Sequence, residues 1–348
     1  MVIIGADLHK RTHTAVAIDE AGRKLGQRTV SATPEGHLEL LDWSHGFCER
    51  RWALEDCRHL SRRLEGDLVR AGESVVRVPP KLMAGARRSD REAGKSDPID
   101  ALAVARAALR EPDLPVARLD GPERDLRLLV DHREDLVTTR TQTANRLRWH
   151  LHELGLAEPG PRSLDRAPVL EGLRIALADQ TGTVARIARE LVECMATLTA
   201  SINALEHEID GLAGKLGPYL RDLQGCGALS AAKLIGETAG MSRFRSRAAF
   251  ARHNGTAPVP VWSGEKTHHR LSRGGNRQLN VVLHRIAITQ IRLGGLGRAY
   301  FDHRLAQGDT KTEAIRALRR RISDEVYRRM RHDEAAQAAQ REPLAAAA

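Results

Sequence analysis

Four acidic residues stand where their carboxylates could share divalent cations. Asp7 closes one apolar run and Glu55 closes another, whereas Asp97 and Asp100 lie three residues apart around a proline. Side chains at that spacing share one face of a helix. Mg²⁺ prefers carboxylate oxygens and keeps positions for water or phosphate, and two such ions can clamp an in-line phosphoryl displacement. We therefore expect these four acids to bind two Mg²⁺ ions, with Mn²⁺ as the alternative.

Each acid also has a purely structural interpretation. Asp97 could cap a helix before an N1 proline, and Asp100 could stabilise the first turn through the helix dipole. Glu55 could be a surface charge. Asp7 is the hardest to explain in this way, because a buried strand seldom ends in an acid without a function.

Alternating strands and helices must position these acids. The predicted elements are, in order, strands over 2–8, 12–18 and 24–30, a helix from 33, a strand over 51–55, a helix over 60–71, a strand over 74–78 and a helix from 97. This order is that of the RNase H-like fold. Asp7 and Glu55 would then end neighbouring strands, and the helix that begins at Asp97 would return two further acids to the same edge.

A long helix is predicted further along the chain. Apolar residues recur there at alternating steps of three and four, which is typical of a coiled-coil seam. The seam comprises Val184, Ile187, Leu191, Met195, Leu198, Ile202, Leu205, Ile209, Leu212 and Leu216. We expect an antiparallel hairpin with the basic helix over 121–156, joined by a loop around Glu158–Pro161. Three roles stay open for it: pairing protomers, clamping nucleic acid, or packing only on itself.

The composition favours a polyanionic partner. The formal net charge is +10, which suits nucleic acid, although a solvated basic surface is the alternative. Aromatic residues are only 3% of the chain, so contacts to phosphates are a better general mode of binding than base stacking. The four scattered cysteines and the lack of a long apolar segment favour a reducing, cytoplasmic, nucleoid-associated location and exclude a membrane-spanning protein.

Two downstream segments carry further candidates. Gly225 and Gly227 resemble the turn of a helix-hairpin-helix, whose backbone N–H groups can face a phosphate; an ordinary glycine turn is the alternative. Ser263 precedes a glycine among basic residues, and by spacing alone it is only a loop serine. The polar residues expected to contact nucleic acid are Lys266, Arg270, Arg273, Asn276 and Arg277. We interpret the adjacent His268 and His269 as phosphate contacts or surface residues.

Together these motifs closely resemble the DEDD transposases of the insertion-sequence 110 family, over about Val2 to Arg331. One block is Asp7, Glu55 and Asp97-x-x-Asp100. The other comprises Gly-Thr-Ala-Pro at 255–258, Ser-Gly at 263–264 and Arg-Leu-Ser-Arg-Gly-Gly-Asn-Arg-Gln-Leu-Asn at 270–280. One departure is Trp262, where family members often carry a small residue or a second serine.

The resemblance implies a RuvC-like N-terminal domain whose acids bind Mg²⁺, and a C-terminal domain that supplies Ser263 as nucleophile. In the family, this serine forms a covalent phosphoserine link to DNA. A structured noncoding RNA of the element pairs with donor and target DNA. The protein assembles as dimers and tetramers, in which the acids of one protomer are thought to meet the serine of another.

The expected architecture is therefore α/β followed by α. The RuvC-like domain spans 1–115, the coiled-coil connector 116–220, and the mainly helical C-terminal transposase domain 221–332, before a disordered tail over 333–348. The expected function is Mg²⁺-dependent strand cleavage and rejoining. The alternatives are a RuvC-like structure-specific nuclease that uses metal-activated water, and a non-catalytic nucleic-acid-binding scaffold.

Overall fold

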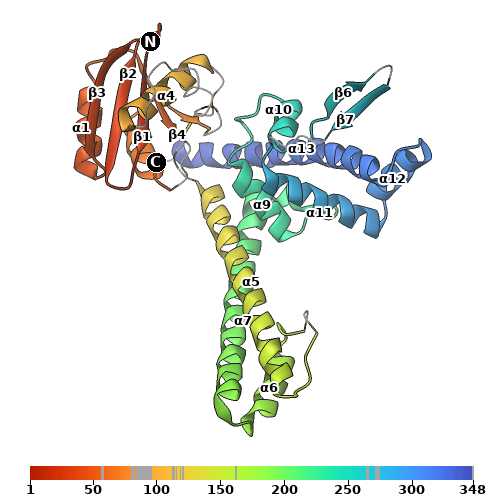
Figure 1. Ribbon diagram of the computed structural model, residues 1–348. Coiled ribbons are helices and arrows are strands. Elements are labelled where there is room, and N and C mark those ends of the chain that lie inside the picture. The colour runs from red at the N-terminus through yellow and green to blue at the C-terminus, as the bar shows by residue number, and fades with distance from the viewer. Residues whose placement is uncertain are drawn as a thin grey trace. The chain divides into compact units, whose positions relative to one another are not determined.

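The computed structural model describes residues 1–55, 59–79, 82, 96–111, 114, 116–117, 119, 121–160, 163–263, 266–270 and 275–346, with only the backbone described over 260–270 and 340–346. Within these limits the chain divides into two units, Met1–Asp120 and Gly121–Ala348. Figure 1 shows their elements.

The apolar runs of the N-terminal unit form a five-stranded sheet. Its strands are β1 (Val2–Leu8), β2 (Thr12–Ile18), β3 (Lys24–Ser31), β4 (Arg50–Glu55) and β5 (Val75–Val78), in the order β3-β2-β1-β4-β5. The pairs β1–β2 and β2–β3 are antiparallel, whereas the pairs β1–β4 and β4–β5 are parallel. This element order and mixed sheet confirm the predicted RNase H-like fold.

Helices cover both faces of this sheet (Figure 1). Successive residues of a strand point to opposite faces, so Ile3 and Ile4 enter different cores. Ile3 packs with α4 (Asp97–Arg110), and Ile4 packs with α1 (Pro34–Ser44) and α2 (Arg62–Arg70). A strand buried on both faces reads as a continuous apolar run, which makes a carboxylate at its end conspicuous.

A helical hairpin begins the second unit. Helix α5 (Pro122–Glu153) runs beside α7 (Gly182–Leu216), and α6 (Ala167–Ala178) lies at their outer end (Figure 1). Of the predicted seam in α7, Met195, Ile202 and Ile209 are buried, whereas the other seam residues are only half-buried. The buried line of α7 is completed by Ala185, Ala188, Val192 and Ala213. Alanines and larger apolar residues thus share the contact line, and the leucines that dominate the sequence pattern flank it.

The middle of the hairpin contact is polar. Arg133 Nε donates to Glu206 Oε1 at 2.9 Å, and an Arg140 guanidinium nitrogen donates to Thr199 Oγ1 at 3.3 Å. Both arginines continue the three-and-four spacing of the buried residues of α5. Polar cross-pairs of this kind help to fix the register of two helices.

The remaining elements form a mainly helical assembly. They are α8 (Pro218–Arg221), α9 (Ala228–Thr238), α10 (Arg247–His253), β6 (Val259–Ser263), β7 (Lys266–Arg270), α11 (Arg277–Leu293), α12 (Leu296–Ala306) and α13 (Lys311–Ala346). Leu126 and Ile209 at the base of the hairpin share one core with α9, α11 and α13. The expected connector and C-terminal domain therefore form one unit. Among the described helices, none combines the length and apolar content of a membrane span.

Over its described part, residues 333–346, the expected disordered tail is helical instead. Helix α13 continues to Ala346, and Asp333 lies buried within it. The Asp333 carboxylate accepts hydrogen bonds from the backbone N–H groups of Tyr219 and Leu220, both at 3.0 Å. These contacts satisfy two of the donors left free at the start of α8.

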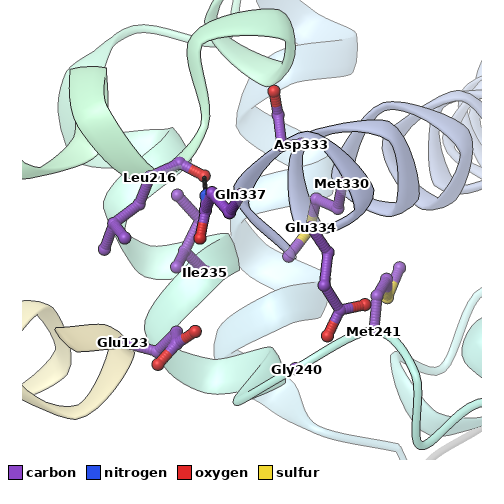
Figure 2. Close-up of a pocket in the computed structure, with 9 residues that line it drawn as sticks. All are labelled: Glu123, Leu216, Ile235, Gly240, Met241, Met330, Asp333, Glu334 and Gln337. Carbon is purple, nitrogen blue, oxygen red and sulfur yellow. Dashed lines mark hydrogen bonds between the residues drawn. The ribbon is translucent and has the colours of Figure 1, made fainter. Parts of the chain in front are cut away.

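A second contact ties the same helix to the hairpin. Figure 2 shows the Gln337 side chain donating to the carbonyl oxygen of Leu216, at 2.6 Å, beside a pocket lined by Met241 and Met330. The alanines that suggested a frayed tail have the highest intrinsic helix propensity. With these hydrogen bonds at its start, the segment extends α13.

Candidate functional site

The position of the site depends first on the close approach of α4 to β1. A Cβ atom added to Gly5 would lie 2.3 Å from the carbonyl oxygen of Ala101 and 2.4 Å from the amide nitrogen of Ala105. Only glycine permits this crossing. Because α4 begins at Asp97, the crossing directs its first turn toward the end of β1, where Asp7 lies.

Replacing Gly5 by alanine is expected to destabilise the N-terminal unit by at least about 2 kcal/mol, because the clashing atoms belong to backbone that can yield only if α4 moves. Hydrogen exchange of the β1 amides, read by mass spectrometry on the full chain, measures the loss. Gly172→Ala, in the middle of α6 with open space around it, is the matched control and should stabilise its helix slightly. Unchanged β1 protection in Gly5→Ala would contradict the assigned crossing.

Three of the four predicted acids converge at this edge. Asp7 and Asp100 are buried, and Asp97 is about half exposed. Ser96 is the N-cap of α4 and Asp97 its first residue, so the capping interpretation of Asp97 is wrong. The structure thus brings a buried strand end and the first turn of a helix together, as the sequence predicts.

The electrostatics of the edge favour a cation. The pKa of Asp7 is raised above its ordinary value, first by burial and then by the neighbouring Asp100 and Asp97 carboxylates, while His9 opposes the shift. Crowded carboxylates in a poorly solvated site are costly unless a positive charge compensates them.

Glu55 lies at the same edge of the sheet without a described contact to Asp7. Strands β1 and β4 are in parallel register up to the pair Ala6–Leu54, so Asp7 and Glu55 are the next residues on each strand. Because Ala53 shares the core under α4, strand alternation places Glu55 on that face too. Its position agrees with the prediction, but its carboxylate is not among the clustered donor atoms described here.

His9 was missed by sequence reasoning. Its Nε2 atom lies 3.1 Å from Asp7 Oδ2 and 3.4 Å from Asp97 Oδ1. Within the described part of the chain, Asp7, His9 and Asp97 each offer one donor atom within 4.8 Å of the others. The signal was the Asp-x-His spacing, because alternate residues of an extended chain point the same way.

This donor set fits a divalent ion. Donor atoms about 2.1 Å from a cation lie roughly 3 Å apart in octahedral geometry, a separation within the span of this cluster. Carboxylates are suitable ligands for both Mg²⁺ and Mn²⁺, and Mn²⁺ accepts an imidazole ligand more readily than Mg²⁺ does. Asp7, His9 and Asp97 are therefore the described residues whose donor atoms are best placed to hold the ion. Asp100 adds negative charge beside Asp7, and Glu55 lies at the same edge of the sheet.

The predicted serine ends a two-stranded ribbon in the other unit. Ser263 is the last residue of β6 and pairs with Lys266 at the start of β7. The same register pairs Val261 with His268 and Val259 with Arg270. Strand alternation therefore assigns Ser263, Lys266, His268 and Arg270 to one face of the ribbon, and His269 to the other. Arg273 lies outside the described residues.

A buried polar network holds both ends of the segment that carries this ribbon. Asn254, which precedes it, donates to Ser323 Oγ at 2.8 Å. Asn280, which follows it, donates to the carbonyl oxygen of Asn254 at 3.0 Å. Gly275 approaches Gly255 so closely that a Cβ would lie 2.3 Å from its amide nitrogen. These contacts bring the two ends of the segment together.

Asn276 belongs to the same network. Its side-chain oxygen caps α11 by accepting from the amides of Gln278 and Leu279, and its Nδ2 donates to Glu237 Oε2 at 2.7 Å. The Asn276 amide, for which the sequence predicts a contact with nucleic acid, is thus used within the protein.

The two glycines of the expected helix-hairpin-helix differ. Gly225 has φ +83° and packs against Thr289 and Ile286 of α11, as the ordinary-turn interpretation requires. Gly227 is exposed, is the N-cap of α9 and has open space around it, which leaves its backbone accessible.

Two family models match this chain. The model of a transposase family with DEDD acids matches residues 4–155, and that of the transposase IS116/IS110/IS902 family matches residues 217–302. The chain is a DNA transposase of the IS110 family. The first match spans the acidic cluster and α5 of this transposase, and the second spans the ribbon with Ser263.

Full-length relatives support this membership. The chain is 28% identical to the 44.8 kDa protein of insertion element IS116 from Streptomyces clavuligerus, covering 94% of each. It is 29% identical to the 43.6 kDa protein of IS110 from Streptomyces coelicolor, covering 92% of each. The RuvC structure from Thermus thermophilus with a Holliday junction substrate aligns with 34% of this chain and 99% of its own, at 18% identity and a TM-score of 0.27.

Proposed function

We propose that this IS110-family transposase cleaves and rejoins DNA through a covalent phosphoserine at Ser263, with divalent ions held by Asp7, Glu55, Asp97 and Asp100. One observation carries the proposal. Asp7, Asp97 and Asp100 converge at one edge of an RNase H-like sheet, in a chain whose second family block contains Ser263.

The proposed chemistry conserves the number of phosphoester bonds. The Ser263 hydroxyl loses its proton and attacks phosphorus, the Oγ–P bond forms, and the leaving deoxyribose oxygen takes a proton. A hydroxyl of another strand then attacks the phosphoserine, which restores Ser263 and joins the new strand. Bound Mg²⁺ or Mn²⁺ would stabilise the negative charge that develops on the phosphate oxygens. Asp7 and Asp100 would supply negative charge to the ion from β1 and α4, so that little reorganisation would be needed.

The choice of DNA sequence is assigned to a structured noncoding RNA of the element, which would pair with donor and target strands. The predominance of cations over aromatics in the chain supports this division, because contacts to phosphates position a nucleic acid without reading its bases. Homodimers or homotetramers would bring the acids of one protomer to the Ser263 of another.

Trapping the covalent intermediate tests this function. The transposase, its element DNA, candidate RNA and Mg²⁺ are mixed, quenched in detergent and run on a denaturing gel. A protein–DNA adduct that maps to Ser263 by mass spectrometry is the expected result. Free hydrolysed ends with no adduct would instead identify a metal-dependent nuclease. If neither an adduct nor hydrolysed ends form, the result would support a non-catalytic scaffold.

The outer face of α11 is the best-defined candidate for phosphate contacts. Arg277, Arg285 and Arg292 recur on this exposed face, and none is paired with an acid in the described part of the chain. His284 lies on the same face, and its pKa is lowered by burial and by Arg319 of α13. Positive charge on this face is therefore not compensated within the described structure, which suits a phosphate backbone.

The triple variant Arg277→Gln, Arg285→Gln, Arg292→Gln is expected to weaken nucleic-acid binding and its salt dependence together. Each lost phosphate contact removes about 0.7–0.9 from the slope of log affinity against log salt, so the slope should fall by roughly 2–3. Fluorescence anisotropy with a labelled duplex, titrated at several salt concentrations without divalent ions, measures it.

The matched control replaces three arginines that are already paired with acids. Arg174, Arg186 and Arg298 contact Glu193, Glu190 and Asp302 at 2.6–2.7 Å, so their replacement by glutamine should change the slope much less. Equal slopes for the two triple variants would refute the assignment of α11 as a phosphate-binding face.

A further inference from the structure

The outer end of helix α5 carries an exposed tryptophan. Trp149 is 75% exposed, whereas Trp52 in the N-terminal sheet is fully buried. An indole left in water forgoes the large free energy that its burial would contribute. Exposed aromatic faces of this kind are typical of binding sites, where a planar ligand can stack on them.

Trp149 forms one wall of a cleft. The cleft has a volume of about 490 Å³ and is lined by Asn145, Arg148, Trp149, His152 and Glu158. This volume lies within the range of small-ligand sites. Its lining combines an aromatic face with amide, carboxylate and imidazole groups, which are the groups that recognise the edges of nucleobases.

Hydrogen bonds fix the polar side of the cleft. A terminal nitrogen of Arg148 donates to Glu158 Oε2 at 3.2 Å, and His152 Nδ1 lies 3.0 Å from Glu158 Oε1. The Nε atom of Arg148 is buried without an acceptor in the described structure. Glu158 thus engages both basic side chains, and it holds Arg148 and His152 in place at the polar side of the cleft.

Basic residues flank the tryptophan on both sides. The segment from Arg146 to His152 reads Arg-Leu-Arg-Trp-His-Leu-His, and Arg146 is exposed. An aromatic face among cations matches the two requirements of single-strand binding, a stacking platform for the base and positive charge for the backbone. Bases inside a duplex are already stacked, so only an unpaired base could reach the indole.

We propose that this cleft binds an unpaired nucleotide of a single strand, with its base stacked on Trp149 and its phosphate near Arg146 and Arg148. This inference depends on the proposed function for one point only, namely that the partner is a nucleic acid. It assigns the outer end of the hairpin to holding a looped or displaced strand.

The test compares Trp149→Ala, Trp149→Phe and the wild-type full chain, without divalent ions so that no strand is cut. Labelled single-stranded RNA, single-stranded DNA and a DNA duplex of equal length are titrated by anisotropy. Trp149→Ala should weaken single-strand binding by roughly 5- to 100-fold, Trp149→Phe should retain most of it, and duplex binding should not change. The single-stranded probe, RNA or DNA, that loses more affinity identifies the kind of strand that the cleft binds.

Ile175→Ala is the control, because Ile175 is 69% exposed on the adjacent helix α6. Unchanged single-strand affinity in Trp149→Ala, equal losses for single strand and duplex, or an altered oligomeric state that accounts for the loss would overturn the inference. The proposed function fails separately, if the wild type binds none of the three probes or forms no adduct.

Discussion

Replacing Ser263 by alanine is expected to abolish strand exchange and the covalent adduct together. Without the Oγ atom no phosphoserine bond can form, and removal of a covalent nucleophile commonly lowers turnover by at least about a thousand-fold. The measurement combines the denaturing-gel adduct assay with sequencing of recombined junctions. Binding of RNA and DNA should remain close to wild type, because the substitution removes no charge.

Ser201→Ala provides the matched control for this prediction. Ser201 is an exposed serine on helix α7, and its hydroxyl has no assigned role, so recombination should continue at the wild-type rate. If Ser263→Ala still recombined, the serine chemistry would be wrong. If it still released hydrolysed ends at the wild-type rate, the acids would act as a nuclease that activates water.

The positions of the acids were predictable because they follow from local patterns. Apolar runs define β1 and β4, and their order defines which strand ends meet, so Asp7 and Glu55 could be placed at one edge. Asp97 and Asp100 then need only lie on one helix for their side chains to share a face. Gly5 could not be identified in this way, because its requirement arises from the backbone of α4, which is distant in sequence.

Other features could not be predicted because they depend on contacts between residues that are distant in sequence. In α7 the pattern emphasised leucines, yet the buried line combines alanines such as Ala188 with larger residues such as Met195, because close helix packing favours small side chains at some contact positions. The end of α13 looked disordered because no local signal shows that Asp333 caps α8. Asn276 looked like a nucleic-acid contact, and only the fold reveals that Glu237 engages its amide.

Replacing Asp7 by asparagine is expected to remove divalent-dependent cleavage without destabilising the N-terminal unit. Asparagine keeps the size of the side chain but loses the charge that an ion requires, and activity should fall by roughly a hundred-fold or more. The pKa of folded Asp7 is raised by burial and by Asp100 and Asp97, so its ionised form weakens the folded state above the unfolded pKa. The neutral amide removes that cost.

Thermal unfolding with and without Mg²⁺ or Mn²⁺ separates these two effects. Wild-type protein should gain stability as the ion concentration rises, because ligands that bind only the folded state stabilise it. Asp7→Asn should start at an equal or higher melting temperature and gain little. Asp42→Asn, a highly exposed acid on α1, should behave like wild type. A full ion-induced gain in Asp7→Asn would show that the ion binds elsewhere, and the cluster at the end of β1 would lose its assigned role.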